Sequence, residues 1–210
     1  MNDKIYPEIP VLERASLALA SASPRRRELL GRLVPSFHLI AADIDETVQL
    51  GEVPLAYVRR LALEKAEAGA RLWATTSPAT GERLIIGADT TVVLGDRLLG
   101  KPTSKEEAVW MLAQLSGQTH QVVTGVAVLL LTDQQILLRR ESLTVATEVE
   151  FQPLRRAEIE WYVATGEPMD KAGAYAIQGY GGALIANIRG DYYNVVGLPL
   201  APLINLLRAF

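Results

Sequence analysis

Cysteine is absent from the 210 residues of this chain. A chain without thiols has no disulfide, no zinc-thiolate centre and no cysteine nucleophile, and it suits a reducing compartment. Histidine is scarce as well, because His38 and His120 are the only two and lack the short spacing of metal ligands. Chemistry must therefore come from carboxylates, hydroxyls, lysines and arginines.

Long apolar runs and a strong net charge are also missing. The longest apolar stretch, residues 122–131, is broken by Thr124 and Gly125 and is shorter than the roughly 20 residues that span a bilayer. A net charge of -3 supplies no basic field to recruit nucleic acid. Residues 1–14 lack the apolar core of a signal peptide. We expect a cytoplasmic protein with no membrane span, no stable nucleic-acid complex and a flexible extension over residues 1–14.

Residues 15–210 contain no internal repeat and alternate between β-type runs and helical patterns, which predicts one α/β domain. Serine before proline at 23–24, and Ser104 with Glu107, are typical helix starts. Gly95-Asp96 suits a hairpin turn, and residues 72–82 suit a surface loop. We expect strands at 17–20, 84–86, 91–94, 97–99, 119–131, 136–151 and 183–189, and helices starting near 24, 54, 104, 154 and 199.

The segment from Ser21 to Arg26 has the residue types of a phosphate-binding loop. The helix predicted after Ser23 would offer unpaired backbone N–H groups, and Ser21 and Ser23 add hydroxyl donors. Arg25 and Arg26 carry planar, permanently charged groups that suit phosphate oxygens. A capped surface helix with solvated arginines explains the same residues, so the segment alone leaves both interpretations open.

Four further charged residues are candidates for chemistry. Asp89 follows a buried apolar run, where a charge needs a partner or a task, such as holding a divalent cation or accepting a proton from water. Glu46 lies in an acidic cluster that could ligate Mg²⁺ or Mn²⁺. Lys65 and Lys101 could neutralise phosphate charge. Each has an ordinary alternative, since Asp89 could cap a turn and the others could be solvated surface charges.

The segment 170–179 is rich in small residues, which let backbone approach a ligand closely. Gln178 has both a donor and an acceptor and could read the edge of a base, although a loop shaped for packing is the alternative. Other nucleotide and hydrolase motifs are missing. The chain has no G-x-x-x-x-G-K-[ST], no G-x-G-x-x-G after a strand and no G-x-S-x-G elbow.

In combination, these segments resemble the Maf family, first named for inhibition of septum formation. The resemblance runs from about residue 16 to 207, and many matches in the same order make chance an unsatisfactory explanation. The matching segments are 19–26, 64–66, 87–90, 100–102, 115–117 with His120, 170–175, 177–179 and 196–200.

The resemblance implies a fold similar to inosine triphosphate pyrophosphatases, with an elongated mixed β-sheet, flanking helices and two lobes around a central cleft. It implies metal-dependent hydrolysis of a nucleoside triphosphate to the monophosphate and pyrophosphate. By this resemblance Asp89 is the catalytic residue, Ser21 and Arg26 match phosphate-loop positions, and Glu46, Lys65 and Lys101 match other charged positions of the cleft. We therefore expect Asp89 and Glu46 to share an Mg²⁺ or Mn²⁺ ion. We expect the phosphates to be bound by Ser21, Ser23, Arg26, Lys65 and Lys101.

The resemblance also bears on the substrate. Arg25, Thr90 and Gln178 match the group that acts on dTTP and UTP, whereas the group that acts on 7-methyl-GTP typically has Trp, Gln and Glu there. Two alternatives stay open: a 7-methyl-GTP pyrophosphatase, and a nucleotide-binding regulator of division without catalysis. A homodimer is common among similar proteins, and the sequence identifies no interface for one.

Overall fold

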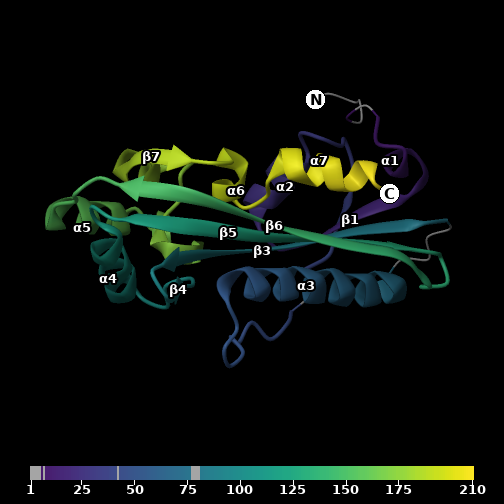
Figure 1. The fold of residues 1–210 in the computed structure, drawn as a ribbon, viewed down its shortest axis with the longest axis horizontal. Coiled ribbons are helices and arrows are strands. Elements are labelled where there is room, and N and C mark those ends of the chain that lie inside the picture. The colour runs from purple at the N-terminus through teal and green to yellow at the C-terminus, as the bar shows by residue number, and fades with distance from the viewer. Residues whose placement is uncertain (1–5, 7, 42, 77–80) are drawn as a thin grey trace. The chain divides into compact units, whose positions relative to one another are not determined.

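The computed structural model describes residues 6, 8–41, 43–76 and 81–210 (Figure 1). Among these residues, seven strands form a mixed sheet in the order β2-β1-β3-β5-β6-β7, with β4 paired to β3. Strand β1 runs parallel to β2 and β3, whereas β4 is antiparallel to β3 and β7 is antiparallel to β6. The predicted α/β class with a mixed sheet is therefore confirmed.

The strands are β1 (Ser16–Ala20), β2 (His38–Leu39), β3 (Arg83–Leu94), β4 (Arg97–Leu99), β5 (Thr119–Leu131), β6 (Leu137–Phe151) and β7 (Ile185–Arg189). The α-helices are α1 (Val11–Arg14), α2 (Pro24–Leu30), α3 (Pro54–Thr76), α4 (Lys105–Leu115), α5 (Arg156–Ala164), α6 (Tyr192–Val196) and α7 (Leu200–Arg208). Short 3₁₀ segments are η1 (Glu167–Asp170), η2 (Ala172–Ala174) and η3 (Tyr180–Leu184).

The chain divides into two compact units. Unit 1 comprises Met1–Asp89, Thr124–Val145 and Gly197–Phe210, and unit 2 comprises Thr90–Val123 and Ala146–Val196. Strands β3, β5 and β6 contribute residues to both units. The boundary in β3 falls between Asp89 and Thr90.

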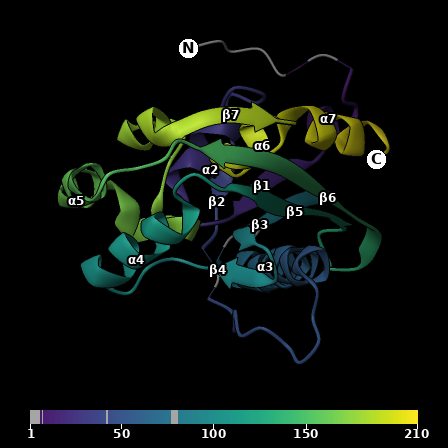
Figure 2. The same ribbon diagram turned by 60° about the vertical axis from the view of Figure 1, so that its left-hand side comes forward.

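In unit 1, helix α3 covers one face of the sheet, and α2 and α7 lie on the other face (Figures 1 and 2). Successive strand residues point to opposite sides of the sheet, so every second residue faces α3. The residues on that face are small or branched. Trp73 closes this core near the end of α3. The cluster includes Ala18, Ala20, Ala62, Ala66, Ala70, Ile85, Ala127 and Leu129.

In unit 2, helices α4 and α5 contact each other (Figure 2) and contribute residues to a core that includes Phe151 and Tyr175. His120, Phe151 and Tyr175 meet edge to face, with centroids 4.8 to 5.4 Å apart. Such edge contacts place the positive ring edge on the negative face of a neighbour. The N-cap of α4 is Ser104, whose hydroxyl accepts from Glu107 N–H, as its sequence predicts.

Two local predictions of secondary structure need correction. Strand β3 continues unbroken through Gly87 and Asp89, where an end was expected, because both positions are buried within the sheet. Residues 72–76 belong to helix α3 instead of a loop, while 77–80 lie outside the described residues.

Part of the predicted flexible extension also differs. Val11–Arg14 form helix α1, and Ile9 and Val11 are buried, so apolar burial holds this stretch in place. Residues 1–5 and 7 of that extension lie outside the described residues. In the part of the chain that the structure describes, no helix combines the length and the apolar composition needed to cross a bilayer.

Candidate functional site

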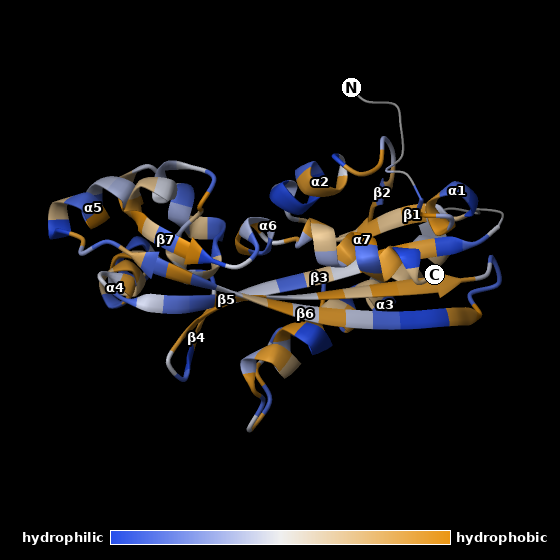
Figure 3. Ribbon diagram, turned by 45° about the horizontal axis from the view of Figure 1, so that its top comes forward, coloured by the Kyte–Doolittle hydropathy of each residue, from blue (hydrophilic) through white to orange (hydrophobic). Residues whose placement is uncertain are grey.

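The loop between β1 and α2 is organised by its own side chains. Ser23 caps α2, since its hydroxyl accepts from Arg26 N–H at 3.5 Å. Ser21 Oγ accepts from Ser23 N–H at 3.2 Å and from the Arg26 guanidinium at 3.3 Å. Helix α2 carries both hydrophilic and hydrophobic residues (Figure 3), and its Leu29 and Leu30 are buried. The predicted helix start is confirmed, and the two serines and Arg26 belong to one hydrogen-bonded loop.

Arg26 is the buried charge of this loop, with 9% of its surface exposed. Its Nε donates to the carbonyl of Gly197 at 2.8 Å, which joins the loop to the segment before α7. Burial lowers the pKa of Arg26, while the negative charge of Asp89 opposes that effect. A guanidinium does not lose its proton in a protein, so Arg26 brings a fixed positive charge to this region.

The approach of α3 to β3 depends on glycine. Ile85, Gly87 and Asp89 share the face of β3 that α3 covers, because side chains alternate along a strand. A Cβ atom at Gly87 would lie 2.2 Å from the carbonyl oxygen of Ala62. The glycine therefore allows the two backbones to come close. Two residues further on, Asp89 then lies within reach of Lys65 on α3.

Lys65 joins two carboxylates that lie far apart in the sequence. Its Nζ lies 2.6 Å from Asp89 Oδ1 and 2.6 Å from Glu46 Oε1. The side chains of Lys65 and Asp89 are only 14% and 11% exposed, so this pair is largely shielded from water. Shielding strengthens the attraction, since water screens exposed pairs. Three residues predicted separately as functional are thus brought together within unit 1.

The carboxylates of the acidic cluster around Glu46 have different partners. Asp45 Oδ1 accepts from the backbone N–H and the hydroxyl of Thr47, at 2.9 and 2.6 Å, and these bonds lower the pKa of Asp45. Glu46 alone extends to Lys65. The phenol of Tyr57 donates to the Glu46 carbonyl at 2.9 Å. Burial, and then the charges of Asp89 and Glu46, raise the pKa of Tyr57 to about 12, so the phenol keeps its proton.

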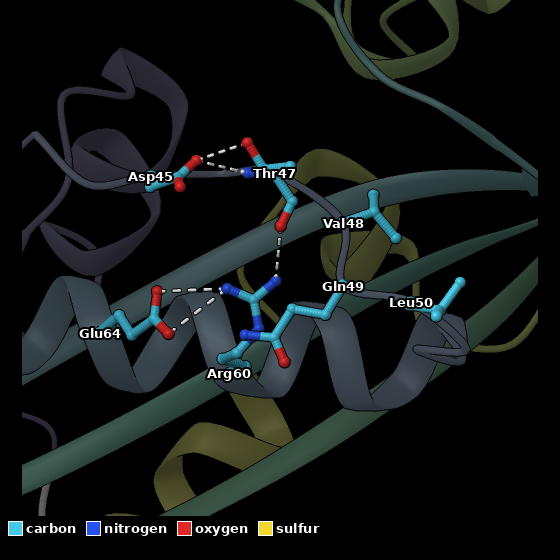
Figure 4. A pocket seen from close by; sticks show the side chains of 7 residues that line it. All are labelled: Asp45, Thr47, Val48, Gln49, Leu50, Arg60 and Glu64. Carbon is cyan, nitrogen blue, oxygen red and sulfur yellow. Dashed lines mark hydrogen bonds and ion pairs between the residues drawn. The ribbon is translucent and has the colours of Figure 1, made fainter.

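Arg60 on α3 binds residues of the segment between Glu46 and α3 (Figure 4). Its guanidinium forms a two-pronged ion pair with Glu52, at 2.7 Å for each contact, and donates to the Thr47 carbonyl at 3.0 Å. It also contacts Glu64 at 3.3 Å. The hydrogen bonds to Glu52, and after them those to Glu64, raise the pKa of Arg60. The hydrogen bond from Arg60 in turn lowers the pKa of Glu52. A pocket of about 410 Å³ is lined by Asp45, Thr47, Val48, Gln49, Leu50, Arg60 and Glu64.

The donor set around Lys65 fits a magnesium-type ion only in part. Glu46 and Asp89 supply carboxylate oxygens, which are the ligands that hard cations prefer. No group of three or more acidic or histidine ligands occurs among the described residues. Magnesium commonly uses one or two protein carboxylates and completes its shell with water and substrate phosphates. The residues present therefore suit an ion that is shared with a phosphorylated substrate.

Of the other predicted site residues, Arg25 is half-buried in unit 1, and Thr90, Lys101 and Gln178 belong to unit 2. Gly100 accepts a backbone hydrogen bond from Gly173 at 3.0 Å, so the segment before Lys101 lies beside η2. Lys101 and Gln178 are exposed, and Thr90 is half-buried. His120 is buried and its Nε2 lies 2.8 Å from the Tyr175 hydroxyl. Burial lowers the pKa of His120 to about 4.

Several residues of these networks escaped the sequence-based prediction, among them Tyr57, Glu52 and Arg60. Arg60 and Glu64 have the four-residue spacing of a helical ion pair, which was the one available signal. The partner of Tyr57 is set by the tertiary fold, so its spacing carries no comparable signal.

Comparison with known proteins identifies the family of this chain. The sequence pattern of the Maf-like protein family matches residues 16–210. The chain is similar to the dTTP/UTP pyrophosphatase of Symbiobacterium thermophilum, with 48% identity over 194 residues, or 92% of this chain and 93% of that protein. It is 51% identical over 196 residues to the dTTP/UTP pyrophosphatase of Myxococcus xanthus, covering 93% of each. This chain belongs to the Maf-like protein family.

Among solved structures, the chain matches the Staphylococcus aureus Ham1 protein with a TM-score of 0.46 and 15% sequence identity. The match covers 93% of this chain and 97% of that one. A likeness at this level adds nothing to the family assignment, which rests on the sequence matches.

Proposed function

We propose that this chain hydrolyses dTTP and UTP between the α- and β-phosphates, releasing the nucleoside monophosphate and pyrophosphate. The observation that carries the proposal is the contact of one ammonium, on Lys65, with the carboxylates of both Asp89 and Glu46. Relatives near 50% identity named dTTP/UTP pyrophosphatases support the substrate class. The reaction belongs to the hydrolases that act on phosphoanhydrides.

The phosphate chain would be bound by the loop of Ser21, Ser23 and Arg26, with Lys65 and Lys101 supplying further positive charge. Support comes from the Arg26 guanidinium, which donates to the Ser21 hydroxyl, and from the Ser23 hydroxyl at the start of the same helix. Charged donors that are already in place stabilise the negative charge that develops as the anhydride breaks. The hydrogen bond from Arg26 to Gly197 keeps the loop ordered before substrate arrives.

Asp89 would be the base that takes a proton from the attacking water. Its carboxylate is largely shielded and paired with Lys65, which holds it in one orientation. Glu46 and Asp89 would hold Mg²⁺ or Mn²⁺, and a bound divalent ion polarises a phosphoryl oxygen and lowers the pKa of a bound water. Within the protein, Lys65 keeps both carboxylates together and balances their charge.

Substrate choice would lie with Arg25, Thr90 and Gln178. Gln178 can donate and accept at once, which suits the imide edge of uracil and thymine, where donor and acceptors alternate. The exposed position of Gln178 leaves it accessible to a nucleotide. We further propose action in the cytoplasm without a stable nucleic-acid partner, consistent with the cysteine-free composition and the net charge of -3. Assembly as a homodimer remains part of this proposal.

Pyrophosphate release from dTTP, UTP and 7-methyl-GTP, with Mg²⁺ or Mn²⁺ added, tests the function. We expect release from dTTP and UTP in preference to 7-methyl-GTP. A preference for 7-methyl-GTP would place the chain in the group of family members that act on that nucleotide. Nucleotide binding without any pyrophosphate release would indicate a regulator instead of an enzyme.

The variant Asp89→Asn tests the catalytic assignment. The amide keeps the size of the side chain but cannot accept a proton, so turnover of UTP should fall about 10²-fold or more. Binding of a non-hydrolysable UTP analogue, measured by calorimetry, should persist. Near-normal turnover with intact binding would contradict the assignment of Asp89 as the base.

A further inference from the structure

The segment that carries Gln178 is wrapped around one carboxylate, that of Glu167 in η1. Oε1 of Glu167 accepts from the Tyr162 hydroxyl at 2.8 Å and from Gly181 N–H at 3.0 Å. Oε2 accepts from Tyr180 N–H at 3.0 Å. One side chain thus satisfies two consecutive backbone donors in the turn directly after Gln178.

The glycine next to Gln178 is explained by the same carboxylate. A Cβ atom at Gly179 would lie 2.0 Å from Glu167 Oε2, so a larger residue here would push the carboxylate away from the turn. Glycine lets the backbone pass this close to the carboxylate while its hydrogen bonds stay in place. The glycine of Gln178-Gly179 therefore fits the position that Glu167 occupies.

The hydroxyl of Tyr162 extends the network to the other side of Gln178. It donates to Glu167 and accepts from Ala176 N–H at 3.0 Å. Tyr162 is fully buried on α5, so its hydroxyl is a fixed point. The backbone is therefore held two residues before and two residues after Gln178. Tyr180 is fixed further by edge-to-face contact with Trp161, with ring centroids 5.9 Å apart.

The carboxylate is charged under ordinary conditions. Burial alone would raise the pKa of Glu167, but hydrogen bonds from Gly181 N–H, the Tyr162 hydroxyl and Tyr180 N–H together hold it below its usual value. Hydrogen bonds to a charged acceptor are stronger than those between neutral groups. The turn is thus ordered by charge-assisted bonds and not by apolar packing alone.

We propose that Glu167 is a positioning residue for nucleotide selectivity, which acts by fixing the turn that presents Gln178. This inference rests on the proposed function, because it takes Gln178 as the residue that reads the pyrimidine. Glu167 itself touches no reacting atom in this scheme. It sets the backbone on which Gln178 is mounted, and so it should affect substrate choice more than the phosphate chemistry.

The test compares Glu167→Gln with wild type on UTP and on CTP, which presents an amine where UTP presents a carbonyl. Glutamine has nearly the same shape but replaces one acceptor oxygen by a donor amide, which leaves a backbone N–H without its partner. We expect KM for UTP to rise about tenfold, with kcat changed less than about threefold. The preference for UTP over CTP should fall by about the same factor as the rise in KM.

Two comparisons make the result specific. Glu160→Gln changes an exposed carboxylate on α5 that pairs with Arg156, and it should leave both constants unchanged. In a cycle with Gln178→Ala, the double variant should lose no more selectivity than Gln178→Ala alone, because both changes act through one residue. If Glu167→Gln folds poorly, Tyr162→Phe removes one donor to the carboxylate and should lower selectivity in the same direction.

The outcomes separate this inference from the proposed function. A wild-type protein that does not hydrolyse UTP or dTTP contradicts the function itself. An active wild type with unchanged selectivity in Glu167→Gln overturns the role of Glu167 and leaves the function standing. An equal fall in kcat on every nucleotide, or additive losses in the double variant, would likewise overturn it.

Discussion

At the scale of single residues, the chemical type of a buried group and the partners around it decide whether it is charged. Lys65 and Arg26 are shielded cations that meet anionic or polar partners, whereas His120 is shielded and neutral beside a phenol. This contrast follows from chemistry, because a guanidinium keeps its proton in a protein, while a buried imidazole without a charged partner gives it up. The first two therefore suit a substrate with negative charge, and His120 suits the core.

His120 predicts how stability depends on pH. Its pKa is about 4 in the folded protein and about 6.5 when unfolded, so between these values only the unfolded chain binds the proton. Stability contributed by the neutral imidazole is present above pH 6.5 and is lost as the pH falls toward 4, by about 3 kcal/mol in all. Chemical denaturation at a series of pH values should show this slope.

The variant His120→Gln should flatten that slope, since glutamine does not titrate. His38→Gln, which changes an exposed histidine, is the matched control and should keep it. A slope that survives in His120→Gln would assign the acid sensitivity to other groups.

At the scale of elements, the distance between α3 and β3 is set by Gly87. An alanine there would place its Cβ against backbone atoms of Ala62 and Ala66, at 2.2 and 2.7 Å, so the helix must move. Overpacking of this kind costs about 1–3 kcal/mol. We expect Gly87→Ala to lower the free energy of unfolding by that amount and to reduce UTP turnover, because Lys65 moves away from Asp89.

Gly100→Ala is the control for this stability change, because a Cβ at Gly100 meets nothing within 4 Å. Its unfolding free energy should stay near that of wild type. Equal losses in the two variants would contradict the argument from close approach.

The loop that carries Glu46 depends on a second feature of α3. Arg60→Met removes the ion pair with Glu52 and the bond to the Thr47 carbonyl, and charged hydrogen bonds of this kind contribute about 1.5–3 kcal/mol each. We expect kcat/KM for UTP to fall about tenfold or more as Glu46 loses its position. Arg156→Met removes an exposed ion pair on α5 and should leave kcat/KM unaltered.

The sequence predicted those elements whose signals are local. Ser23 and Ser104 cap the helices they announce, and Gly95 lies in the turn between β3 and β4. The errors came where tertiary contacts override local preference. Gly87 and Asp89 indicated a strand end, but the approach of α3 and the charge of Lys65 give both residues a place inside the strand. Networks such as those of Arg60 and Glu167 leave little trace in the sequence.

At the scale of the whole molecule, the candidate residues come from both units. Unit 1 contains Ser21, Ser23, Arg25, Arg26, Glu46, Lys65 and Asp89, which include most of the residues proposed to contact phosphate and water. Unit 2 contains Thr90, Lys101 and Gln178, and also the turn held by Glu167. The family match over residues 16–210 covers residues from both units.

Strand β3 passes from one unit to the other without interruption between Asp89 and Thr90. Consecutive Cα atoms are about 3.8 Å apart, and consecutive side chains of a strand point to opposite faces. The residue proposed for proton transfer and a residue proposed for choosing the nucleotide are therefore separated by one peptide bond. The peptide bond between them sets their spacing. A substitution at position 90 could therefore adapt the site to another base while the residue at position 89 keeps its place in the strand.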